Sequence, residues 1–227
     1  MISTTHDSMN SHLGMRRAFT LMEMLVVLAI IAIIAVLVVP AVRGFGQSAA
    51  LTSGGNLIAN AANVARQNAV SKNTMTALLL LGNQGTDQDY RAVAVLEYDP
   101  VAGWSQTNNW EFLPNGVVVD ANDTANCSFL VNSPQPFPFL SRAGGQKNPP
   151  AVFEGKQVAD GGGYAARIFL PNGTLENAEK AAQIRLVEGY VQNGHVVYTR
   201  PGPKGGPSNY YDIAILGLSG TTKITRP

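Results

Sequence analysis

One apolar run dominates the N-terminal part of the chain. Residues 21–39 form a nineteen-residue stretch in which Glu23 is the only residue that is not apolar. At about 1.5 Å per residue, a helix of this length is roughly 28 Å long, close to the hydrocarbon thickness of a bilayer. The pattern therefore predicts a membrane-spanning helix that carries one carboxylate near its start.

A second helical pattern follows at residues 49–71. Apolar side chains, many of them alanines, recur there at spacings near 3.6 residues, which predicts a narrow apolar face that a sheet can approach closely. Ser53 is a candidate N-cap for this segment, and Lys72-Asn73 is expected to end it. Whether the two helical segments form one continuous rod or flank a melted section stays open, because four glycines weaken the helix between them: Gly44, Gly46, Gly54 and Gly55.

Beyond residue 74 the pattern changes to short β-type runs separated by turn residues. The runs predict strands at residues 76–81, 91–98, 117–120, 128–131, 165–170, 183–187, 195–199, 210–217 and 222–225. The motif Leu-Pro-Asn-Gly occurs at residues 113–116 and again at 170–173, where it predicts two tight turns. A helix followed by a series of strands predicts an α+β fold in which the N-terminal helix packs on one antiparallel β-sheet domain.

Glu23 separates three interpretations of the N-terminus. A cleaved secretory signal has a shorter apolar core than this run, and a plain signal anchor leaves the carboxylate unexplained. An ionisable residue inside a membrane segment is by default a functional group with a partner. Arg16 and Arg17 precede the run and only Arg43 follows it closely, so the charge bias predicts a cytoplasmic N-terminus and an extracytoplasmic domain.

The sequence from Ala18 to Ala35 resembles the class III signal of type IV pilins and type II secretion pseudopilins. The resemblance is carried by Ala18-Phe19-Thr20-Leu21-Met22-Glu23, by the apolar run and by Val39-Pro40-Ala41. It implies that prepilin peptidase cleaves between Ala18 and Phe19, that Phe19 becomes N-methylated, and that Pro40 kinks the helix where it leaves the membrane. Ala18 departs from the family, which usually has glycine before the scissile bond, and this puts the efficiency of cleavage in doubt.

The resemblance also implies a role for Glu23 in assembly. In a staggered bundle of such helices, the freed amine of Phe19 on an incoming subunit can neutralise Glu23 of its neighbour. An amine and a carboxylate four residues apart can also pair within one chain, since the rise between them is about 6 Å. Both pairings are open from the sequence.

Motifs in the domain narrow the resemblance. Residues 65–70, 113–119, 168–173 and 220–224 are similar, in this order, to the H-type minor pseudopilins, and the whole span is similar to the Verru_Chthon cassette protein D family. The implied organisation is a leader at 1–18, a transmembrane polymerisation segment at 19–40, a helix extension at 41–73 and a pilin-like β-rich domain at 74–227. The implied function is a minor pseudopilin of a type II secretion-like pseudopilus in the bacterial inner membrane.

Two alternatives stay open: a minor pilin of a type IV pilus, with or without DNA uptake, and a membrane-anchored periplasmic binding domain. The 16 Lys and Arg residues are nearly balanced by 15 Asp and Glu residues, which does not favour nucleic acid as a partner. The C-terminal cations are spread along the chain at Arg200, Lys204, Lys223 and Arg226. The expected partners are other pilins or pseudopilins, the membrane and the processing peptidase.

The chain has few residues from which an enzyme could be built. Cys127 is the only cysteine, which excludes an internal disulfide and a multi-cysteine metal site. His195 lies in a predicted strand, where a structural role is the default, and a nucleophilic Cys127/His195 pair is not favoured. Cys127 could instead pair with a second chain. We therefore expect no catalytic, metal or cofactor-binding residues and no small-molecule substrate.

Overall fold

The computed structural model describes residues 20–131, 152–153, 156–157 and 163–226. Within these ranges it describes only the backbone of residues 37–45, 47, 152–153 and 156–157. The chain divides into two compact units, Met1–Gly44 and Phe45–Pro227. The first unit contributes the beginning of a long helix, and the second contains the end of that helix and the β-rich domain.

Helix α1 runs from Leu21 to Lys72 without a break. Its C-terminus is where the sequence predicts it: Asn73 has a positive φ of 50°, and the amide of Thr74 donates to the carbonyl of Ala69 over 3.2 Å. A residue in the left-handed conformation after the last turn is a common helix stop, and asparagine tolerates it. The helix is therefore continuous, without a melted section, and Ser53 lies inside it and does not cap it.

The glycines of α1 admit close packing. A Cβ added at Gly55 would lie 2.5 Å from the ring of Tyr211, and one at Gly54 would lie 3.3 to 3.4 Å from Val117, Leu113 and Leu186. These two glycines therefore do not break the helix. Their cost in helix propensity is offset by the apolar contact that the missing side chains permit.

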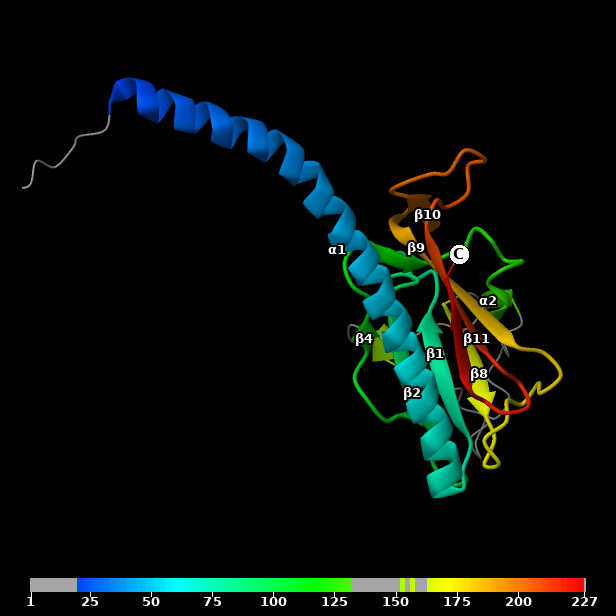
Figure 1. Cartoon of the computed structure of the whole chain (residues 1–227). Helices are drawn as coiled ribbons and strands as arrows, with labels where there is room; N and C mark the ends of the chain where they lie inside the picture. The colour runs from blue at the N-terminus through cyan, green and yellow to red at the C-terminus, as the bar shows by residue number, and fades with distance from the viewer. Residues whose placement is uncertain (1–19, 132–151, 154–155, 158–162, 227) are drawn as a thin grey trace, which may run out of the picture. The chain divides into compact units, whose positions relative to one another are not determined.

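Two antiparallel five-stranded sheets form the domain (Figure 1). The first has the order β3-β2-β1-β8, with β4 also paired to β2; the second has the order β10-β9-β11-β12, with β5 also paired to β9. A separate hairpin joins β6 to β7. The bounds are β1 Thr76–Leu81, β2 Ala92–Asp99, β3 Gly103–Gln106, β4 Glu111–Phe112, β5 Val117–Val119, β6 Val152–Phe153, β7 Lys156–Gln157, β8 Tyr164–Phe169, β9 Ala182–Gln192, β10 His195–Tyr198, β11 Tyr210–Ile215 and β12 Thr222–Thr225.

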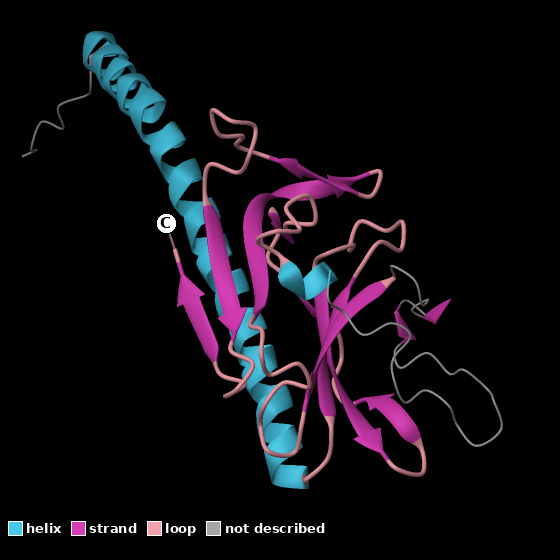
Figure 2. Ribbon diagram, turned by 90° about the vertical axis from the view of Figure 1, so that its right-hand side faces the viewer, coloured by secondary structure: helices cyan, strands magenta, loops and turns pink. Residues whose placement is uncertain are grey.

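The C-terminal part of α1 lies against the strands of the domain (Figure 2), and one core of buried side chains joins it to both sheets. The alanine face of the helix and the inward residues of the strands are all buried in this cluster, which includes Ala61, Ala65 and Ala69 of α1, Leu78 and Leu80 of β1, and Ile213 and Ile215 of β11. Burial of this apolar surface is the main favourable term that holds the helix on the sheets. The predicted α+β fold, with the helix packed on antiparallel sheets, is confirmed.

Residues 128–131 differ from the prediction. The sequence pattern predicts a strand there, but the segment forms the single helical turn α2, Ser128–Val131. The amide of Leu130 donates to the carbonyl of Cys127 over 3.1 Å, and the hydroxyl of Ser128 accepts the amide of Gln183 over 2.9 Å. The turn buries Phe129 in the shared core and leaves Val131 exposed. A strand would alternate its side chains between two faces, whereas this segment needs only one buried anchor.

Candidate functional site

The start of α1 carries a reciprocal pair of hydrogen bonds between Thr20 and Glu23. The Glu23 carboxylate oxygen Oε2 accepts the backbone amide of Thr20 and its hydroxyl, each over 2.9 Å. The amide of Glu23 in turn donates to Oγ1 of Thr20 over 3.2 Å. This arrangement is a capping box, in which a threonine at the N-cap and a glutamate three residues later satisfy each other's amides. Glu23 therefore fixes where the helix begins.

Sequence reasoning found Glu23 but missed Thr20. The signal was present, since a threonine followed three residues later by a glutamate and then by an apolar run is the pattern of a capping box. The charge of Glu23 suggests a role in assembly, whereas its hydrogen bonds with Thr20 are local. The cap gives the carboxylate a structural role within a single chain.

The described side chains after the cap are apolar and exposed around the whole helix. From Leu21 to Val36 every side chain is exposed, including Leu21 at 83% and Leu28 at 66%. A helix that is apolar on all sides needs an apolar environment or packing partners. No helix among the residues described with their side chains is both long and apolar enough to span a membrane.

The other predicted N-terminal site residues are only partly described. Arg16, Arg17, Ala18 and Phe19 lie outside the described residues, so the cleavage junction, the methylation site and the charge bias remain predictions. The backbone of Pro40 belongs to α1, but its side chain is not described, and the kink remains a prediction.

In the domain, Arg66 joins three segments that are distant in sequence. Its Nε donates to the carbonyl of Ser219 over 2.7 Å and to that of Gly173 over 3.3 Å. Gly173 and Gly220 have positive φ values of 83° and 63°, and a Cβ at Gly220 would collide with the carbonyl oxygen of Gly173. The helix thus holds the turn after β8 against the turn between β11 and β12, at the meeting point of the two sheets. The sequence motifs at 65–70, 168–173 and 220–224 come together here.

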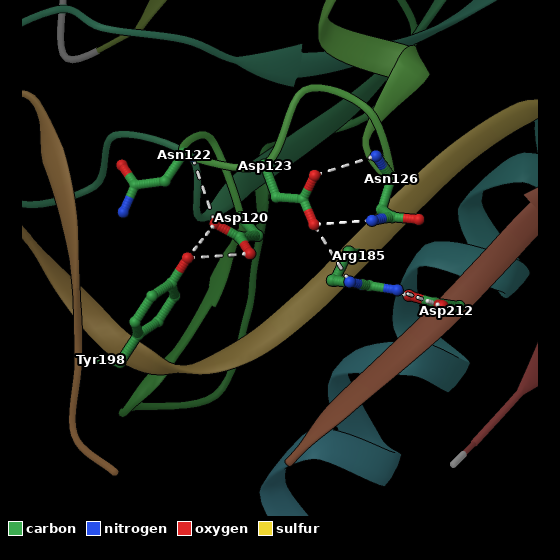
Figure 3. A network of polar contacts seen from close by, with 7 residues as sticks. All are labelled: Asp120, Asn122, Asp123, Asn126, Arg185, Tyr198 and Asp212. Atoms are coloured by element: carbon green, nitrogen blue, oxygen red, sulfur yellow. Dashed lines mark hydrogen bonds and ion pairs between the residues drawn. The ribbon is translucent and has the colours of Figure 1, made fainter. Parts of the chain in front are cut away.

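A polar network lies on the outer face of the second sheet (Figure 3). Arg185 of β9 binds both carboxylate oxygens of Asp212 on β11, at 2.7 and 2.8 Å, and Oδ2 of Asp123 at 3.1 Å. Its guanidinium also lies 3.9 Å from the ring centre of Tyr210. The side chain of Asn126 donates a hydrogen bond to Asp123, and this bond is the main cause that holds the pKa of Asp123 below its usual value. The positive charge of Arg185 lowers the pKa further. This network ties the loop after β5 to the centre of the sheet.

Next to it, Asp120 is fully buried. The hydroxyl of Tyr198 donates to both of its carboxylate oxygens, at 3.0 and 3.1 Å, and the amide of Asn122 donates over 3.2 Å. Burial raises the pKa of Asp120 above its usual value, and the hydrogen bonds from Tyr198 and Asn122 offset this only in part. The residue fastens the end of β5 to β10.

The surroundings of Cys127 and His195 do not favour a nucleophilic pair. Cys127 is buried in the shared core with no exposed surface, and burial raises the pKa of its thiol to about 11. His195 is exposed at the start of β10. A buried, protonated thiol is a poor nucleophile. Within the described ranges, no cluster of three or more His, Cys, Asp or Glu side chains could hold a metal ion.

Comparison with known proteins identifies the N-terminal region. Residues 14–39 match the family model of the prokaryotic N-terminal methylation motif. The match spans Ala18, Phe19 and Glu23, and it confirms the resemblance of this region to the signals of type IV pilins and pseudopilins. The chain therefore carries a prepilin-type N-terminal motif. No curated protein has a sequence that matches the chain significantly.

Several solved structures are similar in part. Two are structures of the minor pseudopilin EpsH from the type II secretion system of Vibrio cholerae. The first has 10% identity, a TM-score of 0.42 and coverage of 78% of this chain and 97% of the other. The second has 13% identity, a TM-score of 0.40 and coverage of 80% and 96%. The type IV minor pilin FimU of Pseudomonas aeruginosa has 14% identity, a TM-score of 0.39 and coverage of 81% and 96%. The fold assignment rests on the helix and sheets themselves.

Proposed function

We propose that this chain is a minor pseudopilin, a structural subunit of a type II secretion-like pseudopilus. Prepilin peptidase removes residues 1–18, Phe19 is N-methylated, and α1 enters a filament through its apolar N-terminal part. The observation that carries the proposal is the match of residues 14–39 to the N-terminal methylation motif. The antiparallel domain behind the helix supports it, because such a domain can present a surface while the helix polymerises.

The capping box clarifies what Glu23 contributes. In the single chain the carboxylate is hydrogen-bonded to Thr20, which satisfies the amide at the helix start but leaves the negative charge without a cation among the described residues. A charge without a partner is disfavoured in hydrocarbon. The amine that cleavage creates on Phe19 supplies the missing cation. We propose that the amine of an incoming subunit does so, which makes assembly favourable.

The proposed location follows from the same motif. The helix anchors the chain in the bacterial inner membrane, with Arg16 and Arg17 in the cytoplasm and the domain on the opposite side. Other pilin-like subunits and the prepilin peptidase are the proposed partners. The proposal includes no enzymatic step and no cofactor.

Intact-mass measurement of the membrane-extracted chain, produced with a prepilin peptidase, tests processing. The expected mass lacks residues 1–18 and gains one methyl group. A full-length, unmethylated chain contradicts the proposal.

A second experiment separates the two tasks of Glu23. Glu23→Gln keeps a side chain that can complete the capping box but removes the charge. Thr20→Val removes the cap hydroxyl and keeps the charge. We expect Glu23→Gln to be inserted and cleaved normally yet to co-assemble poorly with partner subunits, whereas Thr20→Val retains assembly. Normal incorporation of Glu23→Gln into filaments would show that the charge is not the assembly determinant.

A further inference from the structure

β12 ends the second sheet and has an outer edge without a strand beside it among the described residues (Figure 2). The amide of Leu216 donates to the carbonyl of Thr221 over 2.8 Å, which makes these two residues a hydrogen-bonded pair. Because such pairs alternate along an antiparallel ladder, Thr222 and Ile224 direct their amide and carbonyl groups away from β11. Their four backbone groups therefore have no strand to pair with in the part of the chain that the structure describes.

Two other edges of the domain are covered. On β10, the side-chain amide of Asn122 donates to the carbonyl of Val196 over 2.7 Å, and its oxygen accepts the amide of Val196 over 3.3 Å. On β8, the amide of Glu176 donates to the carbonyl of Ile168 over 2.9 Å. Side chains or neighbouring loops thus block pairing at these edges, which is how proteins usually protect a sheet margin. β12 lacks such a cover within the described ranges.

The strand is held in place at both ends. Arg66 binds the carbonyl of Ser219 before it, and Arg226 after it donates from Nη2 to the hydroxyl of Ser48 over 2.6 Å. Both contacts fasten β12 to α1. An edge that is already ordered costs less conformational entropy when a ligand strand is added than a flexible segment does.

The charge at this edge selects the kind of ligand. Lys223 is exposed and lies opposite Ala214 in the ladder, so it has no carboxylate across from it. The diagonal carboxylate, Asp212, is bound through both oxygens to Arg185. A second copy of β12 would place two Lys223 side chains on one short ladder, and like charges there are unfavourable. An added strand that carries carboxylates instead of lysines would place opposite charges next to Lys223, which is favourable.

We propose that the outer edge of β12 binds an extended, acidic segment of a partner protein as an added β-strand. Backbone groups of Thr222 and Ile224 supply the hydrogen bonds, and Lys223 pairs with an acidic side chain of the added strand. This inference goes beyond the pseudopilin proposal and does not depend on it, because binding at β12 needs neither cleavage nor filament assembly.

The test uses the full chain in detergent micelles and a fluorescent synthetic peptide of alternating valine and glutamate. Fluorescence anisotropy measures binding, and hydrogen exchange measures protection of the backbone. We expect saturable binding and slower amide exchange at Thr222 and Ile224 in the presence of the peptide. The absence of binding, or binding without protection at these amides, overturns the proposal.

Two variants and a matched control sharpen the test. Ile224→Pro removes one outward amide and spares the bonds to β11, so we expect binding roughly tenfold weaker. Lys223→Glu reverses the charge and is expected to weaken binding without affecting the fold. Lys204→Glu makes the same charge change at an exposed loop residue and should bind like the unaltered chain. Equal weakening of peptide binding by Lys204→Glu and Lys223→Glu overturns the proposal. Displacement of the peptide from this edge by DNA or by a second copy of the chain also overturns it.

Discussion

The guanidinium of Arg66 donates from Nε to the backbone carbonyl of Ser219 over 2.7 Å, across 153 positions of sequence. The contact joins the helix to the turn between β11 and β12, and the second acceptor, Gly173, adds the turn after β8. One side chain thus holds both sheets in place relative to the helix. Both acceptors are backbone carbonyls, which every residue type has, so the sequence does not reveal their role.

Replacing Arg66 tests this junction. Arg66→Gln keeps helix propensity nearly unchanged but removes the long cationic donor. We expect the free energy of unfolding to fall by about 1.5 to 3 kcal/mol, the range for hydrogen bonds to charged groups. Urea unfolding of the full chain in detergent, followed by tryptophan fluorescence, measures the change. The control is Arg200→Gln, whose residue is half exposed with its Nε 3.9 Å from Glu188, and a loss there equal to that of Arg66→Gln would contradict the assignment.

The helix glycines give a prediction with opposite signs. Gly55→Ala places a Cβ 2.5 Å from the ring of Tyr211, so overpacking should lower the free energy of unfolding by about 1 to 3 kcal/mol. Gly46→Ala adds a Cβ with no atom within 4 Å, and it should raise helix stability by about 0.5 to 1 kcal/mol. Thermal unfolding by circular dichroism distinguishes the two. If both variants are stabilised, helix propensity and not close packing decides the role of Gly55.

Strands such as β1 and β12 could be predicted because each is a short β-type run between turn residues, and the structure places them at the predicted residues. The strands β3 and β4 were missed because their residues are polar or mixed and pair only at the margin of the first sheet. The prediction for segment 128–131 was wrong because four apolar and small residues carry no periodicity that separates a strand from a helical turn. In such short segments, tertiary contacts determine the secondary structure.

The candidate site also has a part that the sequence predicts and a part that it does not. Glu23 stood out because a carboxylate inside an apolar run is rare, and a local pattern marks the capping box. The junction of Arg66, Gly173 and Gly220 could not be derived from spacing, since it depends on which turns the fold brings together. Sequence patterns report local hydrogen bonding and periodicity, whereas backbone acceptors of long-range contacts leave no mark in the residue type.

Acid titration should affect two neighbouring aspartates in opposite directions. Asp120 has a raised pKa in the folded chain, so the folded state binds its proton more readily, and this residue's contribution to stability falls as the pH rises from about 4 through its folded pKa. Asp123 has a lowered pKa, so its contribution is present at neutral pH and is lost as the pH falls through that folded value. Denaturant unfolding between about pH 2 and pH 7, a window that extends to both sides of the usual aspartate pKa of about 4, is the measurement.

The matched variants are Asp120→Asn and Asp123→Asn. We expect Asp120→Asn to reduce the fall in stability that accompanies rising pH and Asp123→Asn to reduce the loss in acid. Similar changes of slope in both variants would show that burial of Asp120 does not govern its titration.

The buried thiol of Cys127 should be unreactive in the native chain. It has no exposed surface, and its pKa of about 11 leaves very little thiolate at neutral pH. We expect maleimide to modify native Cys127 orders of magnitude more slowly than a cysteine introduced by Lys204→Cys, and both to react quickly in urea. Since a disulfide between chains requires the same access to the sulfur, a native chain that stays unlabelled and runs as a monomer on a non-reducing gel assigns Cys127 to the core. Rapid labelling of Cys127 under native conditions, or a disulfide-linked dimer, would mean that the α2 segment opens and that the thiol is available to a partner.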